Sequence, residues 1–398
     1  MLIGVIGKSN VGKTTFFSAA TLVDAEISNR IFTTIEPNKG VTYVRTDCPC
    51  SRLNDAHSAS KSSCNPRNSR CVNGVRFVPI KLVDIAGLVP GAHKGKGLGN
   101  QFLSDIMEAN ALIHVVDMAG ATDESGNPIA PGTRDPKEDI KFLDDEIDYW
   151  ILGILKKNLG TLSKRMEATR EEFPEVIFKQ LSGLGIKIAD VEDTLNKKEI
   201  TPQSDEYDFL EFISLLRQKS KPIVIAANKM DLPAAQANLE RIRDIGYHLN
   251  PCCADYELAL RKAAEHGVLE YNPGDADFTL KKELDPRHNT ALEKIRSFMH
   301  VHKGTGVQNI IDKIVFDVLQ MIVVFPVANE HKLSDLKGNV LPDALLMKKG
   351  STAVDLAFAV HEDIGKKFVA AIDAKTGRNV SASYELKNGD IISIKAGR

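Results

Sequence analysis

The chain has 398 residues, of which 43% are hydrophobic and 26% charged. This composition is that of a folded globular protein, and it excludes a disordered, collagen-like or disulfide-scaffold chain. Lys and Arg number 51 against 53 Asp and Glu, which gives a formal net charge of -2. Any contact with nucleic acid would therefore have to come from a local patch. At about 150 residues per domain, two or three domains are expected.

No segment has the character of a membrane anchor. The longest apolar runs, such as residues 321–325, fall short of the roughly 18 residues that a bilayer-spanning helix needs. The amino terminus has no basic segment followed by an apolar one. We therefore expect an intracellular, cytoplasmic protein without membrane contact.

A phosphate-binding loop opens the chain. Residues 2–6 form a short apolar run that predicts a buried parallel strand, and residues 15–20 predict a helix. Between them, residues 7–14 read Gly-Lys-Ser-Asn-Val-Gly-Lys-Thr and fit G-x-x-x-x-G-K-[ST] without a mismatch. The glycines let successive N–H groups point at one anion, and the helix adds its positive dipole end. Contacts with the nucleotide are expected from Gly7, Asn10, Val11, Gly12, Lys13, Thr14 and Thr15.

A second strand is predicted at residues 78–83, and it ends in Asp-Ile-Ala-Gly. The carboxylate of Asp84 can accept from a magnesium-bound water, and the N–H of Gly87 can reach a γ-phosphate. The motif D-x-x-G is weak alone, but its place at a strand end after a phosphate loop makes it informative.

Two hydroxyls are expected in the same Mg²⁺ shell. Thr14 lies in the phosphate loop, and Thr34, which we prefer to Thr33, lies between the two motifs. Thr34 would order its loop only while the γ-phosphate is present. The alternative for residues 32–38 is a polar edge segment without this role.

A third strand, at residues 221–227, leads into Asn-Lys-Met-Asp, which fits the base-reading motif N-K-x-D and contributes Asn228. The carboxylate of Asp231 can accept from both N1–H and the 2-amino group of guanine, whereas adenine offers neither donor. Sites of this kind discriminate by about 10⁴ to 10⁵. The stem of Lys229 can cover the base plane, and the N–H of Ala254 is expected at the guanine carbonyl. A surface turn after a strand is the alternative.

With these motifs, the chain resembles the Obg-related GTPases, and most closely the YchF subfamily in its archaeal form. The matching stretches are residues 32–38, the glycine-rich residues 84–100, and residues 346–357, which resemble the start of a TGS domain. The resemblance implies an α/β fold: a P-loop NTPase G domain of the TRAFAC type with a helical insertion and a small C-terminal β-grasp TGS domain. Many bacterial and eukaryotic members carry Glu in place of Asp231 and prefer ATP, so that preference is not carried over.

Helical spacing of apolar residues in a charged stretch predicts the insertion, with an antiparallel hairpin as one form. It would serve either to cover the sheet or to dock a partner. Helices are also predicted at residues 310–324 and near residues 354–364. The expected domains are residues 1–134 and 220–325 (G domain), 135–219 (insertion) and 326–398 (TGS domain).

The expected activity is hydrolysis of GTP to GDP and phosphate by a Mg²⁺-dependent conformational switch, with Lys13, Thr34, Gly87 and His93 as its catalytic residues. Ras-like enzymes place a glutamine after D-x-x-G to orient water, but Leu88 stands here and cannot do so. Asn10 sits where related potassium-dependent GTPases hold K⁺. His93 is the nearest titratable side chain that could reach the water, with a solvated histidine as its alternative.

The resemblance implies association of a monomer with the ribosome or a structured RNA. Charge does not support this by itself, because residues 326–398 carry eleven basic against nine acidic side chains. A protein-docking or purely structural TGS domain remains open. Two other functions also remain: a nucleotide-gated ribosome- or RNA-binding protein with incidental turnover, and an ATPase of the wider subfamily.

Four of the six cysteines fall within one polar segment of 24 residues. Stable disulfides are disfavoured in a cytosolic protein, and four thiolates can bind Zn²⁺ tetrahedrally. Free thiols or an occasional disulfide are the alternative, because the C-x-C spacing is tighter than usual. Cys252 and Cys253 are expected to pack near the base-reading loop. The candidate zinc ligands are Cys48, Cys50, Cys64 and Cys71.

Overall fold

The computed structural model describes residues 1–22, 38–53, 64–85, 105–169 and 171–397. The predicted roles of Thr34, Gly87, Leu88 and His93 fall on residues outside this part of the chain. Packing divides the protein into two compact units. The first consists of Met1–Leu22, Glu36–Gly40 and Lys81–Ile310, and the second of Val23–Ile35, Val41–Ile80 and Ile311–Arg398.

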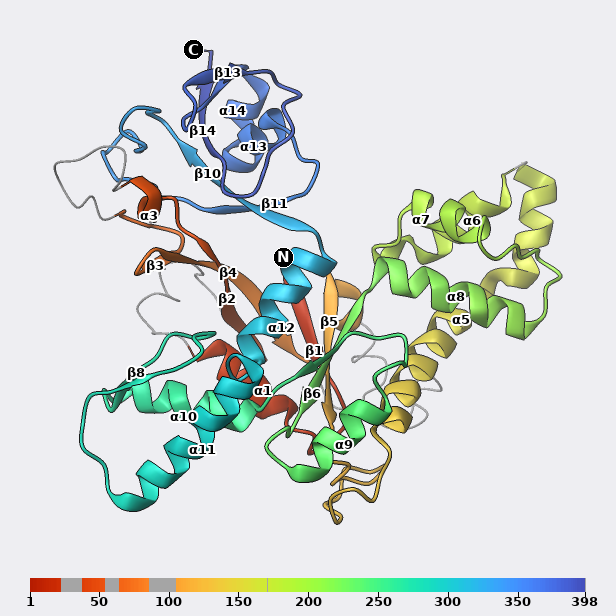
Figure 1. The fold of residues 1–398 in the computed structure, drawn as a ribbon. Coiled ribbons are helices and arrows are strands. Elements are labelled where there is room, and N and C mark those ends of the chain that lie inside the picture. The colour runs from red at the N-terminus through yellow and green to blue at the C-terminus, as the bar shows by residue number, and fades with distance from the viewer. Residues whose placement is uncertain (23–37, 54–63, 86–104, 170, 398) are drawn as a thin grey trace. The chain divides into compact units, whose positions relative to one another are not determined.

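A largely parallel sheet contains the strands from β1 to β7 (Figure 1). Its strand order is β2-β4-β1-β5-β6-β7, and β3 pairs with β4 in antiparallel register. β1 is parallel to β4 and β5, and β6 is parallel to β5 and β7. The three predicted strands are confirmed as β1, β4 and β6. The strands are β1 (Leu2–Ile6), β2 (Lys39–Asp47), β3 (Arg70–Val72), β4 (Val75–Asp84), β5 (Ala111–Asp117), β6 (Ile223–Asn228) and β7 (Leu249–Pro251).

Parallel strands bring their carboxyl ends to one edge of a sheet. For this reason the carboxyl ends of β1, β4, β5 and β6 lie at one edge, where residues up to 217 positions apart in sequence meet. A separate two-stranded sheet joins β8 (Leu269–Glu270) to β9 (Thr279–Leu280). The helices outside the insertion are α1 (Lys13–Thr21), α9 (Pro233–Arg241), α10 (Ala254–Glu265), α11 (Pro286–His302) and α12 (Val307–Lys313).

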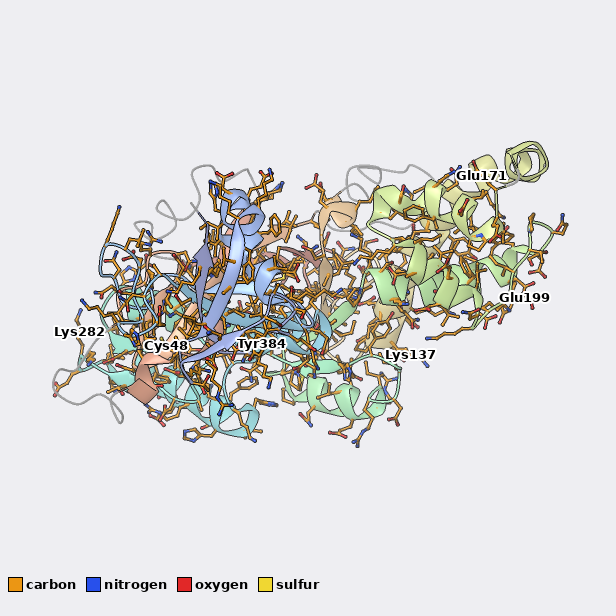
Figure 2. The ribbon with its side chains drawn as sticks, turned by 90° about the horizontal axis from the view of Figure 1, so that it is seen from above. Cys48, Lys137, Glu171, Glu199, Lys282 and Tyr384 are labelled. Carbon is orange, nitrogen blue, oxygen red and sulfur yellow. The ribbon has the colours of Figure 1, made fainter. Side chains whose placement is uncertain are left out.

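The insertion is more than the hairpin that was one predicted form. It contains α5 (Pro136–Thr169), α6 (Phe173–Leu181), the 3₁₀ turn η2 (Ser182–Leu184), α7 (Ile188–Leu195) and α8 (Glu206–Ser220). Glu171 and Glu199 lie on the insertion well away from Lys137 in the first turn of α5 (Figure 2). None of the described helices is both long and apolar enough to cross a bilayer.

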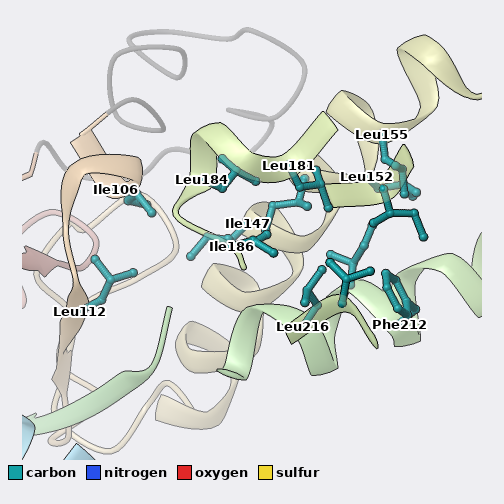
Figure 3. Close-up of a cluster of buried hydrophobic side chains, with 14 of the residues drawn as sticks. Ile106, Leu112, Ile147, Leu152, Leu155, Leu181, Leu184, Ile186, Phe212 and Leu216 are labelled. Atoms are coloured by element: carbon teal, nitrogen blue, oxygen red, sulfur yellow. The ribbon is translucent and has the colours of Figure 1, made fainter. Parts of the chain in front are cut away.

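One apolar cluster joins the insertion to the sheet. Ile147, Leu181 and Phe212 from the helices pack in the same cluster as Ile106 and Leu112 beside and on β5 (Figure 3). The insertion and the sheet therefore share one core. Burial of each such side chain stabilises the fold by about 1.5–3 kcal/mol.

A buried ion pair fastens the same junction. The guanidinium of Arg217 on α8 donates to Asp148, with Nε 2.6 Å from Oδ1, and pairs with Asp144 at 3.2 Å. The hydroxyl of Tyr247, which precedes β7, donates to Asp144 at 2.7 Å. Burial raises the pKa of Asp144, and the charge of Arg217 opposes that rise.

The second unit contains a small mixed sheet, in the order β11-β10-β14-β12-β13, packed against two short helices. This is the predicted β-grasp arrangement. Its elements are η3 (Ile314–Val318), β10 (Met321–Val327), β11 (Leu345–Lys348), α13 (Ala353–Val360), α14 (Glu362–Lys366), β12 (Phe368–Asp373), β13 (Arg378–Val380) and β14 (Ile391–Ala396), with α3 (Cys50–Leu53) before β3.

The predicted helix at residues 310–324 is wrong in its second half. Helix α12 ends at Lys313, the π-helical turn η3 follows, and Met321–Val327 is the strand β10. The β-branched run fits β10 because it lies between β11 and β14. The predicted helix near residues 354–364 is present as α13 and α14, which are interrupted at His361, where φ is −166°.

The compact units divide the chain differently from the expected domains. Residues 41–80 were assigned to the G domain but group with residues 311–398. The backbone explains why: Asn65 N donates to Val340 O at 2.8 Å, and Arg67 N donates to Pro342 O at 2.7 Å.

Candidate nucleotide-binding site

The phosphate loop requires glycine at two positions. Gly7 has a φ of 150°, and a Cβ there would lie 2.6 Å from the carbonyl oxygen of Val115. Gly12 has a φ of 95°, and a Cβ there would lie 2.3 Å from the amide nitrogen of Asn228. The N–H of Phe16 donates to Gly12 O at 2.8 Å and starts α1 directly behind the loop. The backbone is thus shaped as an anion-binding turn at a helix N-terminus.

Three predicted residues converge at the start of α1. The ammonium group of Lys13 forms an ion pair with Asp84 Oδ1. The hydroxyl of Thr14 lies 3.4 Å from Asp84 Oδ2. The N–H of Asp84 donates to Asn38 O at 2.8 Å, which fixes the end of β4. Thr15 is half-buried in the first turn of α1. A cation for phosphates and two oxygen donors for a hard metal ion therefore lie together, and oxygen donors are what Mg²⁺ prefers.

Asn228 has a structural role beside its expected contact with the nucleotide. Its Nδ2 donates to Val11 O at 2.9 Å, and its Oδ1 accepts from Ala254 N at 3.0 Å. The side chain thus connects the phosphate loop to the loop before α10. The N–H of Ala254 is engaged by Asn228, so its predicted contact with the guanine carbonyl would require sharing or exchange of that hydrogen bond.

Lys229 is held by a residue that sequence reasoning missed. Its backbone has a φ of 62°, and its Nζ donates to Asn10 O at 3.0 Å and pairs with Asp117 at 2.9 Å. Asp117, fully buried at the end of β5, also accepts from Ala119 N and Thr122 Oγ1, both at 3.1 Å. The only sequence signal for Asp117 is an acidic residue that ends an apolar run. Its carboxylate aligns the stem that is expected to cover the base.

The base-reading carboxylate is accessible. Asp231 is exposed, and the thiol of Cys253 lies 3.2 Å from its Oδ1. Burial and the charge of Asp231 raise the pKa of the Cys253 thiol, so this sulfur stays protonated and donates. Cys252 and Cys253 are both buried, which confirms their predicted packing near this loop.

Two further side chains of the phosphate loop reach across to the segment after β5. Asn10 has a φ of 60°, and its Nδ2 donates to Gly126 O at 2.9 Å. Lys8 is buried, donates to Thr122 O at 3.0 Å and pairs with Asp139 of α5 at 2.6 Å. Neither contact was predicted. Both orient the loop from its outer side.

A phosphate loop between a parallel strand and a helix, a carboxylate at the next strand end and an N-K-x-D motif at the same sheet edge define a P-loop GTP-binding protein. Family models agree along the chain. They match the 50S ribosome-binding GTPase at residues 2–157, the Obg-like GTPase YGR210-like, G4 motif-containing domain at residues 226–329, and the TGS domain at residues 337–396.

Whole-chain relatives give the family. An uncharacterised GTP-binding protein of Methanocaldococcus jannaschii is 46% identical over 99% of this chain and 98% of its own. The ribosome-binding ATPase YchF of Buchnera aphidicola from Acyrthosiphon pisum is 28% identical over 92% of this chain and 86% of its own. The protein belongs to the YchF-type Obg-like GTPases, as its sequence predicts.

Solved structures agree. The crystal structure of a GTP-binding protein from Pyrococcus horikoshii OT3 has 40% identity and a TM-score of 0.77, with full coverage of both chains. The YchF GTPase of Schizosaccharomyces pombe, at 21% identity and a TM-score of 0.59 over 99% of this chain and 97% of its own, shares the fold. The predicted fold class is confirmed.

Proposed function

We propose that the protein is a Mg²⁺-dependent switch that binds GTP, hydrolyses it to GDP and phosphate, and associates with the ribosome or a structured RNA in one nucleotide state. The observation that carries the proposal is the connection between base-reading and phosphate-binding loops through Asn228 and Lys229. A protein that only bound phosphate would not need it.

The chain's own residues have distinct roles in this proposal. The loop from Gly7 to Thr14 binds the phosphates through backbone N–H groups, and Lys13 exchanges its ion pair with Asp84 for the β- and γ-phosphates. The Asp231 carboxylate accepts from guanine N1–H and N2–H. Because adenine offers neither of these donors, the carboxylate also sets the preference for GTP over ATP.

Magnesium fits the donors present. Thr14 Oγ1 and the Asp84 carboxylate would hold it, since both are hard oxygen donors beside Lys13. When bound, Mg²⁺ neutralises charge that develops on the phosphate oxygens. Asp84 orients this arrangement from the end of β4.

Potassium at Asn10 is a second part of the proposal. The Nδ2 of Asn10 donates to Gly126 O, which leaves Oδ1 as the atom that would face a cation beside the phosphates. A cation there would do the electrostatic work of an arginine finger, worth about 10³ to 10⁵ in rate. Equal GTPase rates in K⁺ and Na⁺ would contradict the proposed K⁺ site.

The proposal that His93 reaches the attacking water is tested with His93→Ala, which should slow GTP hydrolysis without weakening GTP binding.

Nucleotide preference tests the main proposal. Calorimetric titration of the full chain with GTP, GDP and ATP at excess Mg²⁺ should give GTP affinity at least about tenfold above ATP. Asp231→Glu should narrow that ratio. Equal or tighter ATP binding would instead favour an ATPase, the activity named for the Buchnera relative.

Ribosome association is tested separately, because it rests on the family description of the G domain and on the TGS match. When the protein is sedimented with purified ribosomes, it should be found in the ribosomal pellet with GTP and in the supernatant with GDP. If the protein binds the ribosome equally well with GTP when hydrolysis is blocked, the result would favour a nucleotide-gated binding protein with incidental turnover. A cytoplasmic monomer belongs to this proposal, and sedimentation of the protein alone checks its oligomeric state.

A further inference from the structure

Four cysteine sulfurs converge in the second unit. Cys48 follows β2, Cys50 begins α3, and Cys71 lies in β3. The Sγ atoms of Cys48 and Cys64 are 3.9 Å apart, and those of Cys50 and Cys71 are 3.7 Å apart. All four sulfurs lie within 4.8 Å of one another.

The spacing is that of a metal tetrathiolate. A tetrahedral zinc site with Zn–S bonds of about 2.3 Å places its sulfurs about 3.8 Å apart. A disulfide requires a separation of about 2.05 Å, so two disulfides would need both pairs to close by well over an ångström. With four protein ligands no position is left open for water, and this arrangement is typical of a structural site.

Arg76 supplies an independent observation. Its side chain is fully buried, with Nη1 2.9 Å from Ser69 Oγ and Nη2 2.9 Å from Leu341 O and 3.4 Å from Cys48 Sγ. Among the described residues, no carboxylate forms an ion pair with it. A buried guanidinium without an anion is costly, and four neutral thiols supply no negative charge. Four thiolates around a divalent ion carry a net charge of -2 and would provide it.

The chain between the cysteines also explains what the ion would do. The side chain of Asn68 pairs with both backbone groups of Ala344, at 3.0 Å each, and Arg67 forms an ion pair with Asp343 at 2.5 Å. Together with the backbone bonds of Asn65 and Arg67, these contacts attach residues 65–68 to residues 340–344, just before β11. Cys64 and Cys71 bracket the attached stretch.

We propose that Cys48, Cys50, Cys64 and Cys71 bind one structural Zn²⁺ as thiolates. Arg76 balances part of the net negative charge of this zinc–thiolate group, and the ion fixes residues 65–68 against residues 340–344. None of the four cysteines belongs to the nucleotide site, so failure of the zinc proposal and failure of the proposed function are distinguishable.

Metal content is the first test. The full chain, purified without added metal, should carry one equivalent of zinc by mass spectrometry of the elements. Replacement by Co²⁺ should give the visible absorption of a tetrahedral thiolate site. Zinc below about a tenth of an equivalent, bound iron, or two disulfides in the intact mass would each overturn the proposal.

Paired variants test the ligands. Cys71→Ser should lose the zinc, whereas Cys252→Ser, which changes a buried cysteine near the base-reading loop, should keep it. Because Cys71→Ser is expected to fold poorly without metal, chelation of the unmodified protein provides a second measurement. Removing zinc should increase hydrogen exchange at residues 65–68 and 340–344 while GDP affinity stays unchanged. Unaltered exchange in these stretches would contradict the structural role.

Arg76 has its own test. In competition with a chelator, Arg76→Met should weaken zinc retention by about 10- to 100-fold, as expected for a group that acts through the ligands, and Arg76→Lys should recover part of that loss. Equal zinc retention in Arg76→Met and the unmodified protein would show that Arg76 does not stabilise the site. The four cysteine ligands would then be tested by the metal content alone.

Discussion

The amide of Asn228 donates to the carbonyl of Val11 at 2.9 Å, across 217 residues of sequence. Through this bond the residue that opens the base-reading motif holds the phosphate loop. The same side chain accepts from Ala254 N at 3.0 Å. Three loops that would contact different parts of one nucleotide thus depend on a single side chain.

Asn228→Ala should weaken both the fold and the site. It removes a donor and an acceptor at a position that is 3% exposed, and it leaves the Val11 carbonyl and the Ala254 N–H without this partner. The free energy of unfolding should fall by about 1–3 kcal/mol, with a loss of GTP affinity in calorimetry. Asn289→Ala, at an exposed position on α11 where the side chain donates to Leu284 O, is the control and should leave GTP affinity unchanged. An Asn228 variant with unaltered GTP affinity would contradict the linkage.

Gly12→Ala and Gly153→Ala should have opposite effects. At Gly12 the φ of 95° and the Asn228 amide 2.3 Å from the added Cβ leave no room for a methyl group. GTP affinity should fall at least about 100-fold, and the melting temperature should decrease. At Gly153, in the middle of α5, an added Cβ meets nothing within 4 Å. Alanine there should raise the free energy of unfolding by about 0.5–1 kcal/mol in denaturant titration. Similar effects of the two substitutions would refute the steric explanation.

Asp231→Asn should change the base preference of the site from guanine to xanthine. The amide presents a donor where the carboxylate accepted from the guanine 2-amino group, and xanthine carries a carbonyl at that position. Affinity for GTP should fall by about 100-fold or more while affinity for xanthosine triphosphate rises. The measurement is competition against a fluorescent nucleotide, with Asp244→Asn, an exposed residue after α9, as the matched control. Retention of full GTP affinity would show that Asp231 does not read the base.

His114 should make the fold sensitive to acid. Burial in β5, and secondarily the charge of Lys8, lower the pKa of His114 from 6.5 to about 3. Between these values the unfolded chain binds a proton that the folded chain does not, so stability falls as pH decreases below 6.5. For one proton the slope approaches about 1.4 kcal/mol per pH unit.

Urea unfolding between pH 6.5 and 4.5 measures this slope. The His114→Leu profile should be flatter than that of the unmodified protein, and His331→Gln, at an exposed histidine, should leave the slope as it is. Parallel profiles for His114→Leu and the unmodified protein would rule out the buried histidine as the cause.

The sequence predicts well where local pattern and spacing carry the information. Buried parallel strands read as continuous apolar runs, and each motif follows such a run, so the meeting of Lys13, Thr14 and Asp84 could be predicted. The strand β10 could not, because a short apolar run does not show by its periodicity whether it is helix or strand.

Contacts between distant residues explain the other differences. Asp117 accepts from Lys229, and Lys8 of the phosphate loop donates to Thr122 O. Each of these bonds joins residues more than a hundred positions apart. Nothing in the local sequence marks such pairs. Likewise, residues 65–68 attach to residues 340–344 through backbone groups, the side chain of Asn68 and the ion pair of Arg67 with Asp343, which composition does not distinguish from those of an ordinary loop.

The second unit is assembled from three stretches of chain, and the 230 residues from Lys81 to Ile310 precede the last of them. At about 5–20 residues per second, translation needs roughly ten to fifty seconds to cover that interval. During this time the nascent segment around Arg76 has been made, but the carbonyl of Leu341 that receives its guanidinium has not. The segment around Arg76 therefore cannot complete its packing until the carboxy-terminal part of the chain has been synthesised.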